Sequence, residues 1–163
     1  MDKVEVDKSD LQISQEITNS YNKSDKIKNI ALFGVDAPDD ENGRSDSIMI
    51  VTIDPAHEKL KLTSIMRDSY VNIPGYGLDK ISHAYAFGGP QLAIKTLNEN
   101  FGLNITNFMT VNFSSLPIII DTLWGVDISI TEEEVSHIPG ISYAWTYTLT
   151  GNQALSYSRI RYA

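Results

Sequence analysis

The sequence predicts an α/β or α+β fold with a central mixed β-sheet flanked by helices. Short apolar runs, typical of buried strands, alternate along the chain with segments of helical periodicity. Turn-forming Gly, Pro and Asp residues separate these segments. With 163 residues, the chain is long enough for one domain with a hydrophobic core.

Three apolar runs in the first half of the chain predict neighbouring strands. The first covers residues 30–35 and ends at Asp36, as expected of a buried strand. The second, 47–53, and the third, 60–66, are joined by a short polar link that begins with Asp54-Pro55. We therefore predict that these two strands form a hairpin. Further strands are expected over residues 70–73, 109–113 and 126–130.

Helices are expected where Pro, Ser or Gly precedes a periodic apolar segment. Pro90 suits the first turn of a helix over about residues 91–100. Two more helices are expected, one starting at Ser114-Ser115 and one over residues 150–159. Residues 1–26 form a polar lead-in before the folded part, 27–163. This lead-in is either disordered or contains one short helix with a partial apolar face, made of Leu11, Ile13, Ile17 and Tyr21 and capped by Asp10.

Composition and charge exclude several function classes. The net charge of −8 opposes binding of nucleic acid through bulk electrostatics. The absence of cysteine excludes disulfides, cysteine nucleophiles and thiolate metal sites. No apolar run approaches the ~20 residues that span a bilayer. The polar start is not a signal peptide, so it is either a natural cytosolic start or the start of a segment that follows a removed anchor.

Charged residues stand at the ends of the predicted strands. Asp36 follows the first strand, Arg44 and Asp46 precede the second, and Arg67 and Asp68 follow the third. Because a hairpin brings its open ends together, we expect Asp46 and Arg67 to lie near one another. Two further arginines close the chain, Arg159 and Arg161.

These residue types suit a site for phosphate groups. Arginine binds phosphate oxygens with a planar fork, and carboxylates beside it can hold a hard cation such as Mg²⁺. The alternatives are ordinary ones: aspartates that form turns, surface ion pairs, and a solvated helix end. The three histidines lack metal-ligand spacing, so we interpret His57 and His137 as surface residues and His83 as a structural or pocket-edge residue. Tyr76, Tyr85 and Phe87 suit either a core or an apolar pocket.

The order of these groups resembles the LytR-CpsA-Psr family. The resemblance extends over residues 27–161 and is carried by seven segments, Asn29–Asp36, Gly43–Met49, Ser64–Tyr70, Ile73–Gly75, Asp79–Gly89, Leu123–Asp127 and Leu149–Arg161. Met66 and Trp124 depart from the usual pattern, which has Pro and Gly there. The family pattern also continues beyond Arg161, so a C-terminal segment is expected to be missing.

The resemblance implies a membrane-anchored enzyme whose catalytic domain lies outside the cytoplasmic membrane. Such an enzyme transfers a teichoic acid, capsular polysaccharide or similar glycopolymer from an undecaprenyl-pyrophosphate carrier to peptidoglycan. The anchor would precede this chain, and the lipid tail would occupy an apolar pocket between sheet and helices. Our candidates for the lining of that pocket are Leu116, Ile119, Ile120 and Leu123.

The resemblance also assigns roles to the charged residues. Asp36 and Asp46 match the family's aspartates associated with Mg²⁺ (or Mn²⁺). The pyrophosphate-binding positions match Arg44, Arg67, Lys80, Arg159 and Arg161. Arg67 and Asp68 are the candidates for a direct role at the reacting phosphate. A lipid-diphosphate hydrolase, a non-catalytic polyprenyl-phosphate binding module and a transcription regulator are the alternative functions.

Overall fold

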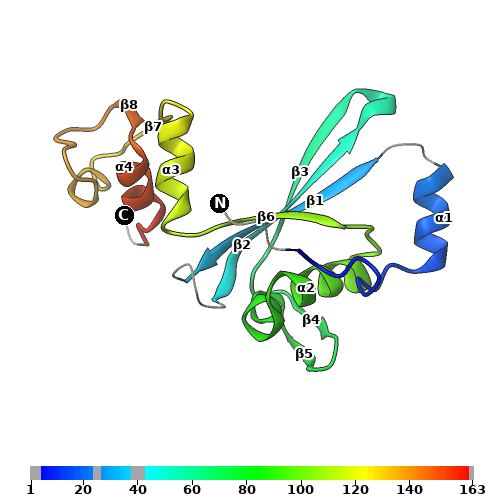
Figure 1. Cartoon of the computed structure of the whole chain (residues 1–163). Helices are drawn as coiled ribbons and strands as arrows, with labels where there is room; N and C mark the ends of the chain where they lie inside the picture. The colour runs from blue at the N-terminus through cyan, green and yellow to red at the C-terminus, as the bar shows by residue number, and fades with distance from the viewer. Residues whose placement is uncertain (1–4, 24–26, 38–42, 162–163) are drawn as a thin grey trace. The chain divides into compact units, whose positions relative to one another are not determined.

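The computed structural model describes residues 5–23, 27–37 and 43–161 of the chain (Figure 1). It divides into two compact units, the first ending at Val111 and the second beginning at Asn112. Within the described residues, no helix is long and apolar enough to cross a membrane. Each unit has its own hydrophobic core, and we describe each by itself.

The first unit contains a four-stranded sheet, a small hairpin and a long helix. Its elements are α1 (Gln15–Lys23), β1 (Lys28–Asp36), β2 (Arg44–Asp54), β3 (Lys59–Ile65), β4 (Tyr70–Ile73), β5 (Gly77–Lys80), α2 (Ile81–Phe101) and β6 (Asn107–Val111). The large sheet has the order β3-β2-β1-β6, with β6 parallel to β1 and the other pairs antiparallel. This mixed sheet confirms the predicted fold class.

The predicted hairpin of the second and third strands is present as β2 and β3. The two strands pair from Ile48↔Ile65 to Asp54↔Lys59. Their connection is a short 3-10 turn in which the Asp54 side chain accepts a hydrogen bond from the backbone N–H of His57 at 3.3 Å. The open ends of the hairpin therefore lie together, as the sequence indicated.

Helix α2 covers one face of the sheet because both surfaces are apolar. Alternate residues of β1 and β2, including Phe33 and Ile48, are buried in one core with Ile94 and Leu97 of α2. The Phe33 ring meets the Tyr85 ring edge to face, with centroids 5.3 Å apart. Tyr85 is therefore a core residue.

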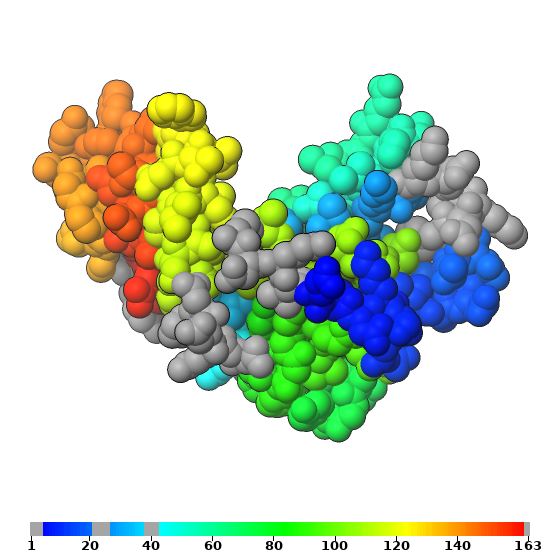
Figure 2. All heavy atoms as spheres, in the orientation of Figure 1, coloured from blue at the N-terminus to red at the C-terminus, as the bar shows by residue number. Residues whose placement is uncertain are grey.

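The N-terminal segment lies against α2 and is held there by polar contacts. Figure 2 shows residues 5–14, in dark blue, over the green surface of α2. The buried Asn98 side chain donates to the backbone carbonyls of Leu11 (2.9 Å) and Ile105 (3.0 Å) and accepts from the N–H of Ile105 (2.8 Å). A helix forms in the lead-in, but it begins at Gln15, and Ser14 rather than Asp10 accepts a hydrogen bond from its first turn.

Helix α2 is longer than predicted and has a break inside it. It starts at Ile81 rather than near Gln91, and its backbone is not helical at Gly88 and Gly89. Gly89 has φ 60° and ψ −157°, a conformation essentially restricted to glycine. The Gly-Gly-Pro run therefore marks an internal kink, and a helical segment lies before it.

The second unit contains α3 (Ser115–Thr122), β7 (Val126–Ser129), β8 (Thr146–Leu149) and α4 (Gly151–Ser158). Strands β7 and β8 form an antiparallel pair, and α3 packs on α4. Thr150 and Gln153 form a capping box at the start of α4. The predicted helices and the strand over 126–130 are confirmed, whereas β8 and the β5 strand of the first unit were not predicted.

Candidate functional site

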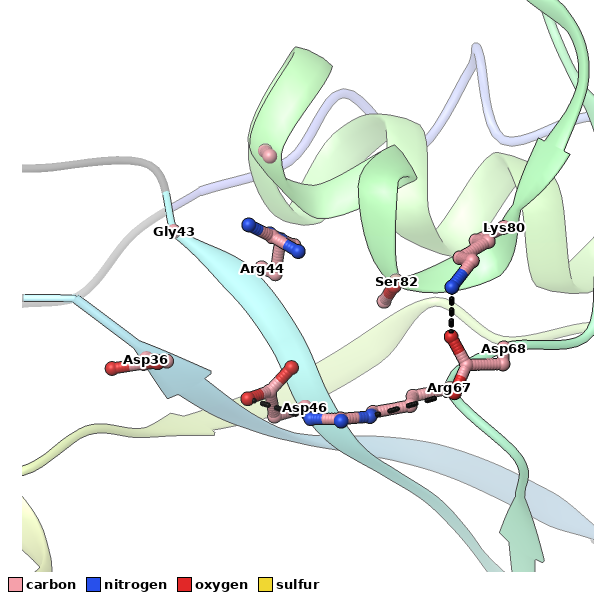
Figure 3. Close-up of a pocket in the computed structure, with 9 residues that line it drawn as sticks. Asp36, Gly43, Arg44, Asp46, Arg67, Asp68, Lys80 and Ser82 are labelled. Atoms are coloured by element: carbon pink, nitrogen blue, oxygen red, sulfur yellow. Dashed lines mark hydrogen bonds and ion pairs between the residues drawn. The ribbon is translucent and has the colours of Figure 1, made fainter.

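A polar cavity of about 410 Å³ lies in the first unit, at the open end of the β2–β3 hairpin. Figure 3 shows the lining side chains, which come from β1, β2, the turn after β3, the end of β5 and the start of α2. The lining residues are Asp36, Gly43, Arg44, Asp46, Arg67, Asp68, Lys80, Ser82 and Ala86. Most of the charged residues singled out in the sequence therefore meet in one pocket.

A β-bulge places Asp46 in this pocket. Gly34 of β1 pairs with Ser47 of β2, but the next residue, Val35, pairs with Ser45. Asp46 is therefore the extra residue on β2, and no residue of β1 pairs with it. Bulges bend a strand and redirect a side chain, and they are frequent beside active sites.

Ion pairs connect four of the pocket residues in one chain of contacts. Lys80 Nζ lies 2.6 Å from Asp68 Oδ1, and Arg67 Nε lies 3.7 Å from Asp68 Oδ2. Arg67 Nη1 lies 3.0 Å from Asp46 Oδ2, which confirms the predicted proximity of these residues. The hydrogen bond from Lys80 lowers the pKa of Asp68, with further lowering by the charges of Lys80 and Arg67. Because the four side chains are partly exposed, the contacts orient the cations more than they stabilise the fold.

Backbone hydrogen bonds fix the turn that carries Arg67. The Ser82 N–H donates to the Arg67 carbonyl at 3.1 Å, and the Ile81 N–H donates to the Ser69 carbonyl at 2.8 Å. The first turn of α2 thereby satisfies two of its free N–H groups with this turn. The position of the Arg67 backbone is set by these bonds and not by the Arg67 side chain.

The two predicted metal-binding aspartates line the same pocket but point apart. Figure 3 shows the Asp36 carboxylate directed away from that of Asp46. Across the described parts of the chain, no group of three or more His, Asp or Glu side chains could hold a metal ion alone. Two carboxylates nevertheless suit Mg²⁺, which is usually bound by one or two carboxylates together with substrate phosphate oxygens. Their metal-binding role stays a prediction.

Arg159 and Arg161 lie in the second unit, at the end of α4 and just after it. The Arg159 guanidinium lies 4.9 Å from the centroid of the Phe113 ring. Arg161 Nη1 donates to the backbone carbonyls of Ser158 (3.0 Å) and Ile160 (3.3 Å). Both side chains are exposed, and pyrophosphate binding by them stays a prediction.

The predicted apolar lining lies on and just after α3. Leu116, Ile119 and Ile120 are half-buried, and Leu123 is exposed. Ile120 packs against the core of the second unit, so core packing accounts for that residue. The cavity of the first unit, by contrast, is lined by polar groups.

The histidines have the places that the sequence indicated. His83 Nδ1 lies 2.9 Å from Asp79 Oδ2, and this hydrogen bond is the main cause of a lowered pKa of Asp79. His83 is half-buried and is not among the lining residues of the cavity, so its contact with Asp79 supports the structural alternative. His57 and His137 are exposed.

An aromatic pair lies beside His83. Tyr76 and Phe87 stack with ring centroids 4.7 Å apart and remain exposed. The His83 ring is 5.7 Å from that of Phe87. Neither ring of the pair is part of the buried core.

Three lining residues were not singled out in the sequence: Gly43, Ser82 and Ala86. A Cβ atom on Gly43 would lie 2.5 Å from the Asp36 carbonyl oxygen, so the close approach of the two strand ends requires glycine. Ser82 and Ala86 are one helical turn apart on α2, in the part of that helix that was not predicted. A helical interpretation of residues 81–87 would have placed both on one face.

Comparison with known proteins identifies the family. The model of the LytR_cpsA_psr family matches residues 2–163. The chain belongs to this family. This confirms the resemblance of the ordered motifs.

Two curated relatives show how much of a longer protein the chain corresponds to. One is named polyisoprenyl-teichoic acid–peptidoglycan teichoic acid transferase TagU, from Oceanobacillus iheyensis, and is 39% identical over 160 residues, covering 94% of this chain and 49% of the relative. The other is named regulatory protein MsrR, from Staphylococcus aureus, and is 40% identical over 143 residues, covering 86% of this chain and 43% of the relative. The chain thus spans about half the length of these relatives.

Solved structures share the fold. TagT (YwtF) with bound octaprenyl pyrophosphate superimposes with a TM-score of 0.78 at 28% identity, covering 98% of this chain and 66% of that one. TagT bound to LI-WTA superimposes with a TM-score of 0.79 at 29% identity, covering 99% of this chain and 64% of that one. The mixed α/β architecture is therefore that of the family.

Proposed function

We propose that this chain carries the diphosphate-binding part of an enzyme that transfers a phosphate-linked glycopolymer to peptidoglycan. The observation that carries the proposal is the pocket in which Arg44, Arg67 and Lys80 lie beside Asp46 and Asp68. Arginine and lysine side chains gathered in one pocket bind a dianionic or trianionic group, and a diphosphate is such a group.

The relatives support both the donor and the reaction. The TagU relative is named for transfer of teichoic acid from a polyisoprenyl carrier to peptidoglycan. One solved TagT structure contains octaprenyl pyrophosphate, and another contains LI-WTA. On this basis we infer a polyprenyl-diphosphate-linked teichoic acid or similar polymer as the donor and peptidoglycan as the acceptor.

The proposed reaction is a phosphoryl transfer. A hydroxyl oxygen of the acceptor glycan attacks the phosphorus that carries the glycopolymer, forming a phosphodiester. The bond between that phosphorus and the bridging oxygen breaks, so polyprenyl phosphate leaves and the hydroxyl proton passes to the medium. Arg67 would neutralise charge on the oxygens around the attacked phosphorus, and Arg44 and Lys80 would hold the diphosphate.

We also propose that Asp36 and Asp46 hold Mg²⁺ or Mn²⁺ together with phosphate oxygens of the donor. A bound cation of this kind supplies positive charge to the diphosphate. Asp46 also pairs with Arg67 at 3.0 Å, so the cation and the guanidinium would share this carboxylate. Asp68 would keep Arg67 and Lys80 oriented toward the substrate.

The polyprenyl tail requires an apolar surface, for which the α3 residues Leu116 and Ile119 remain our candidates. A donor of this type lies in a membrane, and peptidoglycan lies outside it. We therefore propose action at the outer face of the cytoplasmic membrane, through an anchor in the whole protein.

Regulation of transcription, one of the alternatives considered from the sequence, is the less favoured function. The MsrR relative is named only as a regulatory protein. The net charge of −8 opposes binding to the phosphate backbone of DNA. Salt-dependent binding of this chain to duplex DNA would support it instead.

Two measurements test the proposal. Calorimetry with farnesyl diphosphate in the presence of Mg²⁺ should show saturable binding to the chain, and mass spectrometry of co-purifying lipid should find a polyprenyl phosphate or diphosphate. Incubation of the whole protein with a labelled lipid-linked glycopolymer should then yield labelled peptidoglycan. Release of free glycopolymer phosphate without an acceptor would show a hydrolase, and absence of diphosphate binding would reject the proposal.

A further inference from the structure

The hydroxyl of Ser82 is a polar group in the pocket wall for which the protein provides no partner. Ser82 is only 3% exposed. Its backbone N–H donates to the Arg67 carbonyl, but among the described residues its Oγ has no hydrogen-bond partner. Among the described residues, Ser45 Oγ is the only fully buried side-chain polar atom without a partner, so the Ser82 oxygen reaches the cavity that it lines. A hydroxyl that faces a cavity without a protein partner is available to a ligand.

The position of this hydroxyl is fixed with respect to the cations of the pocket. Ser82 is on the first turn of α2, two residues after Lys80, and its backbone N–H is hydrogen-bonded to the Arg67 carbonyl. Figure 3 shows its oxygen pointing from α2 into the pocket. Because the backbone is held by a hydrogen bond and the side chain is short, the hydroxyl oxygen stays close to the pocket wall.

We propose that Ser82 is a further substrate-binding residue, whose hydroxyl donates a hydrogen bond to a phosphate oxygen of the donor's diphosphate. The inference rests on the proposed function, because it takes the ligand of the pocket to be a diphosphate. A serine hydroxyl is a neutral donor, and a phosphate oxygen between Arg67 and Lys80 is an anionic acceptor. Binding would give a partner to the one lining hydroxyl that the described fold leaves unpaired.

Ser82→Ala tests the proposal because folding and binding respond differently. Without ligand, the variant loses no hydrogen bond within the protein, so its thermal midpoint should equal or exceed that of the parent. With farnesyl diphosphate in Mg²⁺, its Kd should rise about 10-fold, as expected for loss of one hydrogen bond to a charged group. Ser64→Ala, which removes an exposed hydroxyl on β3, serves as the matched control and should change neither quantity.

Inorganic pyrophosphate identifies the part of the ligand that Ser82 contacts. A contact with phosphate predicts the same fold-loss for inorganic pyrophosphate as for the farnesyl compound. A loss of affinity confined to the farnesyl compound would overturn the proposal. So would a Kd of Ser82→Ala for farnesyl diphosphate that lies within about twofold of the parent value. A clear fall in the midpoint without ligand would also overturn it, by showing that the hydroxyl is structural. If the parent chain binds neither compound, the proposed function fails, and the role of Ser82 fails with it.

Discussion

Arg67→Ala removes the guanidinium between Asp46 and Asp68, and the structure predicts separate effects on stability and affinity. The Arg67 side chain is 50% exposed, and its partners are 33% and 53% exposed. Exposed ion pairs contribute about 0–1 kcal/mol each. The bond from the Ser82 N–H to the Arg67 carbonyl survives the substitution. With two such pairs, we therefore expect the free energy of unfolding to fall by less than about 2 kcal/mol.

The affinity for diphosphate should fall far more. A guanidinium that makes paired hydrogen bonds to phosphate oxygens contributes about 3 kcal/mol, at roughly 1.5 kcal/mol per bond. This corresponds to a Kd for farnesyl diphosphate that is about 100-fold higher. In the whole protein, transfer of glycopolymer should be abolished, because in the proposed reaction the same side chain would neutralise charge at the attacked phosphate.

Calorimetry with farnesyl diphosphate and urea denaturation measure the two effects on the same sample. Arg67→Lys should bind with intermediate affinity, since it keeps the charge and loses the fork. Lys61→Ala, which removes an exposed cation on β3 outside the pocket, is the control for general electrostatics. A Kd equal to the parent value would remove Arg67 from the site. A loss of stability above about 3 kcal/mol would show that the residue is structural instead.

Other contacts lead to three more expected outcomes. Asn98→Ala should lower the free energy of unfolding by about 3 kcal/mol, because it leaves three buried backbone groups of Leu11 and Ile105 unpaired. Urea denaturation measures this loss, and a value under about 1 kcal/mol would contradict the expectation. The hydrogen bond from Lys80 holds the pKa of Asp68 below its ordinary value of 3.8, so its stabilisation is present above that pH and is lost as the pH falls below it. The parent should therefore lose more stability than Asp68→Asn between about pH 4 and about pH 2, and parallel acid-unfolding curves would refute the assignment. Chelation by EDTA should raise the Kd for farnesyl diphosphate reversibly, and an affinity that is insensitive to EDTA and to added Mg²⁺ would argue against the metal site.

The aspartate and arginine of the hairpin could be placed from sequence because strand pairing is regular. Two apolar runs joined by a short Asp-Pro link form a hairpin, and the residues just outside both runs then share one end. Asp46 and Arg67 are such residues, and their 3.0 Å ion pair confirms the reasoning. The family was also evident from the sequence, because the order of its motifs is preserved along the chain.

The rest of the pocket depends on contacts between segments. Asp46 enters the cavity through a bulge, which arises from the mismatch between two strands and leaves no trace in either strand alone. The Gly88-Gly89-Pro90 run predicts the start of a helix, although a helical segment precedes it. Sequence reasoning therefore misses Ser82, since its position on the pocket wall depends on that first turn of α2.

Local periodicity and residue chemistry were enough to predict the alternation of strands and helices, the hairpin and the kinds of charge available. They were not enough to predict how Asp68 pairs with Lys80 and Arg67, the bulge at Asp46, and which hydroxyl of the pocket wall is left without a partner. Those properties depend on distances of a few ångströms between segments far apart in the chain, and register shifts and backbone breaks set these distances.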